Sequence, residues 1–332
     1  MNLPVPAPEG PLEPPTLEEI RAQHDALSRL VLRTPLWPWR GRSADHLLDR
    51  GTQASIKLEL FQHAGSFKAR GALTAIGALD PAAMANGVVA VSQGNHAMAV
   101  SFAAGVLGTS AKVIMPTTAS TARRMGCVNY GAEVLLAEDM NDAFAKASEL
   151  VKSEGRTLIH PYEGPRIALG TATLGLEIAE QMPDLEAIVI PVGGGGLAAG
   201  VACAIKQMLP GTLAFGVEPF GADSLYRSFQ TGKCESIPAV TTIADSLGAP
   251  HAAPYSFGLC RKYLDDVVRV QDDEIRRAMA LMFRHLKLAV EPAGATAMAG
   301  LLGPLHARLA GLRVCVIACG TNIDSEIGRA HV

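Results

Sequence analysis

The chain has 332 residues, of which 48% are hydrophobic, 18% charged and 5% aromatic, a composition typical of a globular α/β protein with one large domain or two interleaved domains. The formal net charge is −3 and no basic block stands out, so we do not expect the protein to bind nucleic acid. The six cysteines are widely spaced without a CxxC pair, which favours a reducing, cytoplasmic compartment.

The first 15 residues are rich in proline. They contain six prolines and two acids and lack the basic-then-apolar order of a signal peptide, so we expect a flexible leader. The longest apolar stretch, 187–205, is long enough to suggest a membrane span. Pro191 and four consecutive glycines interrupt it, however, and it is better explained as a buried strand followed by a buried helix. We therefore expect no membrane association.

The rest of the chain alternates between strand and helix patterns. Thr16 to Glu19 forms a capping box for a helix expected to end near Leu30, and Thr34-Pro35-Leu36 begins an extended segment. Further strands are predicted at 55–60, 87–91, 112–115, 132–137, 157–159, 187–191, 213–217, 267–270 and 313–318. Helices are predicted at 69–79, 97–107, 121–130, 141–153, 171–181, 197–208, 272–286 and 291–302, with a loop-rich tract up to about residue 263.

This alternation predicts an α/β fold whose parallel-type sheets are covered by helices on both faces. No linker divides the chain cleanly, so we expect two interleaved lobes with a cleft between them. The smaller lobe is placed at 85–163, and the larger, discontinuous lobe at 1–84 and 164–332.

Lys68 is the first candidate functional residue. It lies in the segment Gly65-Ser66-Phe67-Lys68-Ala69-Arg70-Gly71-Ala72, at a predicted turn from strand to helix, where side chains can project into a cleft. A lysine beside a turn glycine is usually a solvated residue. Its significance therefore depends on two glycine-bearing turns further along the chain.

The turn richest in glycine is 193–196, between a predicted buried strand and a helix that starts at Leu197. Without Cβ atoms, Gly193, Gly194, Gly195 and Gly196 allow several backbone N–H groups to converge on one anion at the positive end of the helix. No GxxxxGK[ST] motif is present, which argues against a nucleoside triphosphate site. An acid lies about twenty residues further on, at Glu218, so a nucleotide-binding oxidoreductase stays open as an alternative from another class.

Two more turns follow predicted apolar strands. Ser92-Gln93-Gly94-Asn95-His96 offers backbone N–H groups and an amide, which suit a carboxylate or a ring hydroxyl, although the same residues suit a helix cap. His96 is interpreted equally well as a catalyst or as a histidine satisfied at a helix start. Cys319 begins the turn 319–322, where a free cysteine is most often a buried small hydrophobe, so we do not expect a nucleophile there.

In this order, the four segments resemble the fold type II PLP-dependent enzymes, most closely the serine/threonine dehydratase and serine racemase group. Secondary matches are Thr34-Pro35-Leu36, Val217-Glu218-Pro219, Thr242-Ile243-Ala244-Asp245 and Glu291-Pro292, so the resemblance spans roughly residues 30–325. It implies a two-lobed fold of the tryptophan synthase β type, with pyridoxal 5′-phosphate (PLP) in the cleft against the larger lobe. It also implies a small amino-acid substrate and a homodimer.

The resemblance assigns a role to each segment. Lys68 would form the covalent carbon–nitrogen link to the PLP aldehyde and serve as the catalytic base, with Phe67 beside the ring. The phosphate would be held by the amides of Gly193, Gly194, Gly195, Gly196 and Leu197. Asn95 would bind the ring hydroxyl, and the substrate carboxylate would be bound by Ser92, Gln93, Gly94, Asn95 and His96. Cys319 would face the pyridine nitrogen; since a thiol does not keep the ring protonated, β-elimination is favoured over transamination.

The expected activity is that of a dehydratase, or ammonia-lyase, which converts a 3-hydroxy amino acid such as L-serine or L-threonine into a 2-oxo acid and ammonia. Racemisation is disfavoured because Gln93 replaces the hydroxyl-bearing second base of racemases, and its amide accepts no proton at neutral pH. A β-replacement enzyme and a non-catalytic relative that only binds a ligand stay open as well. Gln93 also suggests a substrate with a larger or acidic β-group.

No metal ligands are assigned. The divalent-cation site of the family matches at Glu218 and Ala222, but Ser224 replaces its second acid, which leaves the site short of charge. Because the sequence continues only briefly after the Cys319 turn, we expect no regulatory domain and therefore a catabolic role.

Overall fold

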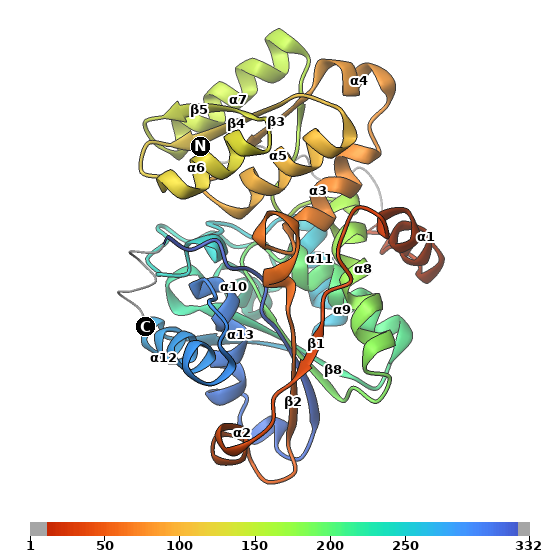
Figure 1. Ribbon diagram of the computed structural model, residues 1–332, viewed down its shortest axis with the longest axis vertical. Coiled ribbons are helices and arrows are strands. Elements are labelled where there is room, and N and C mark those ends of the chain that lie inside the picture. Colours follow the sequence, from red (N-terminus) through yellow and green to blue (C-terminus); the bar gives the residue numbers. More distant parts are fainter. Residues whose placement is uncertain (1–11, 325–332) are drawn as a thin grey trace.

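The computed structural model describes residues 12–324, so residues 1–11 of the expected leader and residues 325–332 lie outside the described part. Two sheets organise the fold, and Figure 1 shows them in two lobes, with helix α3 (Lys68–Gly77) close to the junction. The predicted two-lobed α/β fold is confirmed.

The larger lobe contains a six-stranded sheet in the order β1-β2-β10-β7-β8-β9. Its strands are β1 (Leu36–Pro38), β2 (Gln53–Lys57), β7 (Ala187–Pro191), β8 (Leu213–Pro219), β9 (Asp266–Val270) and β10 (Arg313–Ile317). Strand β1 runs antiparallel to its neighbour, whereas the other pairs of this sheet are parallel. Strand β10 lies between β2 and β7, with Cys315 opposite both Ser55 and Ile188. The last strand of the chain is therefore central to the sheet.

The smaller lobe contains a parallel sheet in the order β5-β4-β3-β6. The strands are β3 (Val88–Val91), β4 (Ala111–Pro116), β5 (Glu133–Ala137) and β6 (Thr157–Leu158), and the helices are α4 (Pro81–Asn86), α5 (Asn95–Leu107), α6 (Thr121–Asn129) and α7 (Met140–Glu154). Val88 and Ala90 pack in a cluster with α5, whereas Val89 and Val91 pack on the opposite face with α7. This alternation explains why β3 is apolar at every position.

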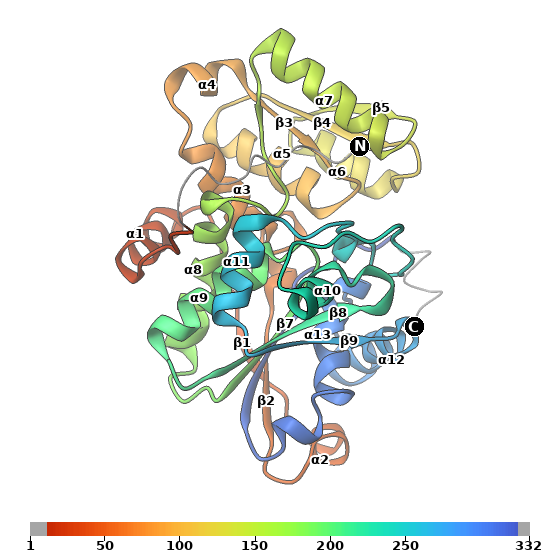
Figure 2. The same cartoon turned by 180° about the vertical axis from the view of Figure 1, so that it is seen from behind.

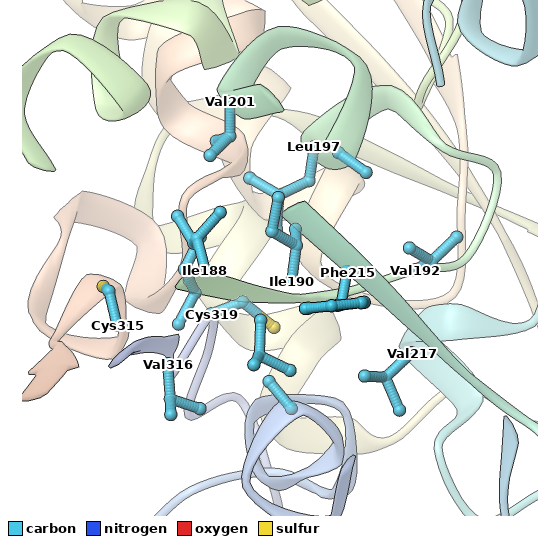
Figure 3. Packing of buried hydrophobic residues seen from close by; sticks show 14 of the residues in the cluster. Ile188, Ile190, Val192, Leu197, Val201, Phe215, Val217, Cys315, Val316 and Cys319 are labelled. Carbon is cyan, nitrogen blue, oxygen red and sulfur yellow. The ribbon is translucent and has the colours of Figure 1, made fainter. Parts of the chain in front are cut away.

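Helices cover the larger sheet too, as Figures 1 and 2 show from opposite sides. The remaining α-helices are α1 (Leu17–Leu27), α2 (Arg42–Leu47), α8 (Pro165–Gln181), α9 (Gly196–Met208), α10 (Ser224–Thr231), α11 (Pro254–Tyr263), α12 (Asp272–Leu281) and α13 (Pro292–Leu302). Apolar side chains fill both faces of this sheet (Figure 3). Ile188 and Ile190 of β7 lie on one face and Phe215 and Val217 of β8 on the other, because Val189 is opposite Phe215 and Pro191 opposite Val217. This apolar cluster supports the strand ends from which the glycine and cysteine turns project.

A buried cluster of charges anchors α3. Arg70 donates to both carboxylate oxygens of Glu59, at 2.9 Å each, and to both of Glu177, at 2.8 and 3.1 Å. Lys57 donates to Glu177 at 2.8 Å, and all four side chains are at most 1% exposed. Two positive charges thus balance two negative ones just behind Lys68, the first residue of the helix.

The sequence predictions differ from the structure at several boundaries. The strand predicted at 55–60 ends at Lys57, because Glu59 turns inward to Arg70 and two short 3-10 turns, Glu59–Phe61 and His63–Gly65, follow. The loop-rich prediction for the tract before 263 was wrong, since it contains α10 and α11. Several helix boundaries also differ: α1 stops at 27, α8 starts at 165, and α12 passes into a π-helical turn at 282–286. Helices α2 and α4 were not predicted.

The apolar stretch 187–205 forms β7 and most of α9, as predicted. Within residues 12–324, no helix combines the length and the apolar character that crossing a bilayer requires.

Candidate active site

A cavity of about 560 Å³ opens between the two lobes. It is lined by the turn after β3, the glycine turn after β7, the turn after β10 and the start of α3. Every residue that the sequence predicts for a site lines this cavity: Phe67, Lys68, Ser92, Gln93, Gly94, Asn95, His96, Gly193, Gly194, Gly195, Gly196, Leu197 and Cys319. The fold therefore brings the four segments together at the carboxyl ends of parallel strands, where α/β proteins bind ligands.

Lys68 projects into this cavity from the first position of α3. Its Nζ donates to the carbonyl oxygen of Pro161 and lies 5.2 Å from the centre of the Phe67 ring. Burial lowers the pKa of Lys68 to about 8, although Cys319 and Glu291 act in the opposite direction. A large share of the amine is thus neutral near that pH, which a nucleophile or base requires.

The glycine turn is shaped so that side chains would not fit. Gly195 has a φ of +89°, in the left-handed region that favours glycine, and is the N-cap of α9. A Cβ at Gly194 would overlap the ring of Tyr162, and one at Gly193 would lie 2.9 Å from the backbone of Leu247. Gly195 supplies no side-chain cap to α9, and the first N–H groups of a helix have no partner within it, so this turn suits an anion.

The turn after β3 leads into α5, whose first residues are Asn95 and His96. The Asn95 Nδ2 donates to Glu291, and its Oδ1 accepts from Asn322 Nδ2 at 2.8 Å. His96 Nε2 lies 2.8 Å from the Ile159 carbonyl oxygen. Burial, together with the nearby Lys68 amine, lowers the pKa of His96 to about 3, so this ring stays neutral. His96 therefore has the geometry of a structural histidine at the start of a helix, hydrogen-bonded to a backbone carbonyl.

An ionic network that joins the two lobes was not anticipated. Arg123 of α6 donates to both carboxylate oxygens of Asp245 and, through Nε, to the Asn322 carbonyl oxygen at 3.0 Å. Its guanidinium also lies 3.9 Å from Glu291, whose pKa burial raises to about 7. Asp245 and Glu291 occur in sequence segments that the resemblance already covered, but without an assigned role. Arg123 carries no sequence signal, because its partners are distant in the chain.

A tyrosine that packs on the glycine turn is the second unanticipated feature. Tyr162 follows β6, and its hydroxyl lies 3.1 Å from His251 Nε2 and 3.3 Å from the His251 carbonyl oxygen. His160 packs edge-on against the same ring, with the centroids 4.7 Å apart. All three residues line the cavity. For His160 and Tyr162, the position just after the predicted strand 157–159 was the one available signal, whereas His251 comes from the loop before α11.

The comparisons with known proteins agree with this geometry. The profile of the family described as pyridoxal-phosphate dependent enzyme matches residues 27–320. The chain belongs to this family. It is 48% identical over 318 residues to a phenylserine dehydratase of Ralstonia pickettii, and the match covers 96% of each chain. It is 38% identical over 271 residues to a catabolic L-threonine dehydratase of Escherichia coli, and this match covers 81% of this chain and 82% of that one. Maize serine racemase is a structural neighbour at 32% identity and a TM-score of 0.89, covering 95% of this chain and 96% of that one.

These relatives confirm the predicted class: the protein is a PLP-dependent enzyme of the hydroxy-amino-acid dehydratase, or ammonia-lyase, type. PLP is its cofactor. The observed site suits this molecule, because a glycine cradle that any Cβ would fill faces the same cavity as a lysine of lowered pKa. A nucleotide-binding oxidoreductase is not supported.

Cys319 closes the cavity at the end of β10. It is 1% exposed and lies within the apolar cluster of β7 and β8 (Figure 3). Burial raises the pKa of the Cys319 thiol well above its ordinary value, so the sulfur stays protonated and uncharged. This is consistent with a small hydrophobe and not with a nucleophile.

The position that corresponds to the family's cation site, near Glu218, is occupied by protein contacts. The Glu218 carboxylate accepts from the backbone N–H groups of Leu225 and Tyr226, at 3.1 and 2.6 Å. Ser224 Oγ instead donates to the Ala249 carbonyl oxygen at 3.2 Å. Within residues 12–324, no group of three or more histidines, cysteines or acids is arranged to hold a metal ion. The residues present therefore do not fit a divalent cation.

Proposed function

We propose that this dehydratase acts on 3-hydroxy amino acids with a bulky apolar β-substituent, the phenylserine class, and converts them into a 2-oxo acid and ammonia. The observation that carries this proposal is the apolar lining of the cavity. Met140 and Phe144 of α7 lie on its wall together with Val240 and Pro250. Aromatic substituents gain most from such a lining, because they bury a large apolar surface. The high identity to a phenylserine dehydratase supports the same assignment.

The polar residues of the cavity argue against an acidic β-group. Arg123 is the cation best placed to receive a second substrate carboxylate, but Asp245 already holds it bidentately and Glu291 lies beside it. Two carboxylates share one guanidinium, so a third negative charge would meet repulsion. Of the two kinds of substituent that Gln93 suggested, these contacts favour the larger apolar one.

We propose that the site residues act as follows. PLP, when bound, supplies the electron-withdrawing ring that stabilises the charge left on Cα after its proton is removed. Lys68 holds the cofactor and, once its amine is free and neutral, takes that proton, guided by the Pro161 carbonyl oxygen. The amides of residues 193–197 hold the phosphate.

The remaining roles concern the substrate and the ring. The N–H groups of the 92–96 turn would hold the substrate carboxylate. Asn95 would bind the ring hydroxyl, with its amide oriented by Glu291 and Asn322. The neutral thiol of Cys319 lines the same cavity and would lie beside the pyridine nitrogen, leaving it without a charged partner. Gln93 supplies no second base, so elimination takes precedence over racemisation.

Four further properties are proposed with this function. The lobes divide at 85 and 163, which is consistent with the span of the smaller sheet, 88–158. The protein works as a homodimer, in keeping with the family resemblance. It is cytoplasmic, in keeping with six cysteines that are all free. Its similarity to a catabolic threonine dehydratase favours a role in amino acid catabolism.

A substrate panel tests the proposed specificity. Release of 2-oxo acid from phenylserine, threonine, serine and 3-hydroxyaspartate, each as threo and erythro isomers where they exist, should give the highest kcat/KM for a phenylserine isomer and the lowest for 3-hydroxyaspartate. Phe144→Ala should lower kcat/KM for phenylserine by roughly tenfold while sparing serine, because it removes apolar contact with the substituent.

Phe283→Ala is the matched control, since Phe283 is exposed and lies outside the cavity. Preference for 3-hydroxyaspartate, or equal loss for all substrates in Phe144→Ala, would contradict the specificity. No turnover of any 3-hydroxy amino acid would contradict the activity itself.

A further inference from the structure

We propose that the guanidinium of Arg269 takes the place of the family's divalent cation at the corner between β8 and α10. This inference concerns how the cofactor site is supported, and it does not depend on which substrate the enzyme uses. The corner contains Glu218 near the end of β8, the short 3-10 turn Phe220–Ala222, and Asp223, which precedes α10. Both acids are almost fully buried, so they need a positive charge nearby.

Arg269 supplies this charge from the neighbouring strand. Strand β9 pairs with β8 so that Arg269 lies opposite Glu218, and paired residues of parallel strands project from the same face of a sheet. Arg269 Nη1 donates to Asp223 Oδ2 at 2.8 Å. Burial raises the pKa of Glu218 well above its ordinary value, and Asp223 adds to this rise, whereas the N–H groups bound to Glu218 and the Arg269 guanidinium oppose it. The guanidinium thus acts on both acids.

Two aromatic rings hold the guanidinium in this position. Its central carbon lies 4.3 Å from the centre of the Phe220 ring and 3.9 Å from the centre of the Tyr226 ring. A cation over the face of an aromatic ring is attracted by the ring electrons. The Arg269 side chain is 27% exposed, whereas that of Arg227, which also donates to Asp223, is 52% exposed. Arg269 is therefore the more firmly held of these two cations.

The corner supports two walls of the cofactor cavity. Leu225, the second residue of α10, is fully buried next to the glycine turn, since a Cβ at Gly195 would lie 3.7 Å from Leu225 Cδ1. Ser224 Oγ, from the first residue of α10, donates to the carbonyl oxygen of Ala249, which lines the cavity. A shift of α10 would move both contacts. Arg269 is therefore a positioning residue that acts on the cofactor site through this helix.

A resident guanidinium makes the enzyme indifferent to divalent cations. The Glu218 carboxylate already accepts two N–H groups and Ser224 provides no acid, so a cation would find few oxygen ligands. It would also meet the positive charge that Arg269 places on Asp223. Millimolar Mg²⁺, Ca²⁺ or EDTA should therefore leave the Tm and the PLP absorbance of the wild-type holoenzyme unchanged. A loss of either in EDTA that Mg²⁺ or Ca²⁺ restores would overturn the proposal.

Removal of the guanidinium tests its supporting role. Arg269→Met keeps an apolar stem beside the two rings but removes the charge. It should lower the Tm by at least about 3 °C and weaken PLP binding about threefold or more in an absorbance titration. Arg269→Lys keeps the charge and should lose less of both. The matched control is Arg227→Met, which removes the more exposed partner of the same Asp223 carboxylate. Equal losses in Arg269→Met and Arg227→Met would overturn the assignment.

Ser224→Asp separates a replaced cation from a purely structural arginine, because it restores the missing acid of the family's cation site. In the double variant Ser224→Asp/Arg269→Met, a third acid joins Glu218 and Asp223 without the guanidinium. Mg²⁺ or Ca²⁺ should then raise the Tm by at least about 3 °C, and EDTA should abolish the gain. With Arg269 present, Ser224→Asp alone should respond less. If the two variants respond alike, whether both gain stability or neither does, Arg269 does not stand in for a cation.

Discussion

The buried charge cluster behind Lys68 should make Arg70→Leu one of the most destabilising single changes in the chain. Arg70 forms four hydrogen bonds to Glu59 and Glu177. Its removal leaves two buried carboxylates with Lys57 as their buried cation and with His24 3.6 Å from Glu177. Breaking a buried ion pair from one side costs about 3–5 kcal/mol, because the remaining charge stays desolvated. For a chain of this size, that corresponds to a fall in Tm of about 10 °C.

Thermal unfolding of the variants, measured without added PLP, checks this expectation. Arg33→Leu is the matched control, because Arg33 forms an exposed ion pair with Glu180, with the side chains 51% and 38% exposed. Such a pair contributes at most about 1 kcal/mol. Arg70→Lys should fall between the two, since it keeps the charge but not the fork of donors. If Arg70→Leu unfolds no earlier than Arg33→Leu, the cluster does not stabilise the fold as described.

Two further predictions concern residues of the cavity. Because burial raises the pKa of Glu291 to about 7, above the ordinary value of a glutamate, its contribution to stability is present at low pH and lost as the pH rises through 7. As the pH rises from 5 to 8, Glu291→Gln should therefore become more stable relative to wild type, by up to about 3 kcal/mol. Tm values of the two proteins, measured in pairs at each pH, check this. A Tm difference that stays constant with pH would contradict the raised pKa of Glu291. Gly194→Ala should displace Tyr162 and weaken PLP binding at least about tenfold by absorbance titration, whereas Gly211→Ala, with open space around its Cα, should bind normally. Normal PLP binding by Gly194→Ala would contradict the assignment of the glycine turn as the phosphate site.

Much of the site was predictable because its parts lie in short segments at strand ends. The Gly193–Gly196 turn and Lys68 are readable from residue type and spacing, and parallel strands bring such turns to one edge. Arg123 and His251 were not predictable in this way. Each gains its role from contacts with residues more than 80 positions away, across the lobes or from a loop, and neither stands in a periodic pattern or glycine turn.

The errors in the fold have a similar origin. Glu59 fits the alternation of polar and apolar residues that predicts a longer β2. The backbone turns there instead, because the buried Glu59 carboxylate needs a charged partner and Arg70 supplies it. Helix α11 starts at Pro254 after Ala253, which offers no capping side chain. Instead Glu163, from the distant Tyr162 segment, accepts the N–H groups of Tyr255 and Ser256. A cap supplied from elsewhere in the chain leaves no local signal.

The covalent link between Lys68 and PLP is tested most directly by borohydride reduction of the purified, yellow holoenzyme, followed by peptide mass spectrometry. We predict that the reduced cofactor is fixed on the peptide that contains Lys68, and that Lys68→Ala binds PLP reversibly, carries no such label and releases no 2-oxo acid. A label on a different lysine, or full turnover by Lys68→Ala, would contradict it.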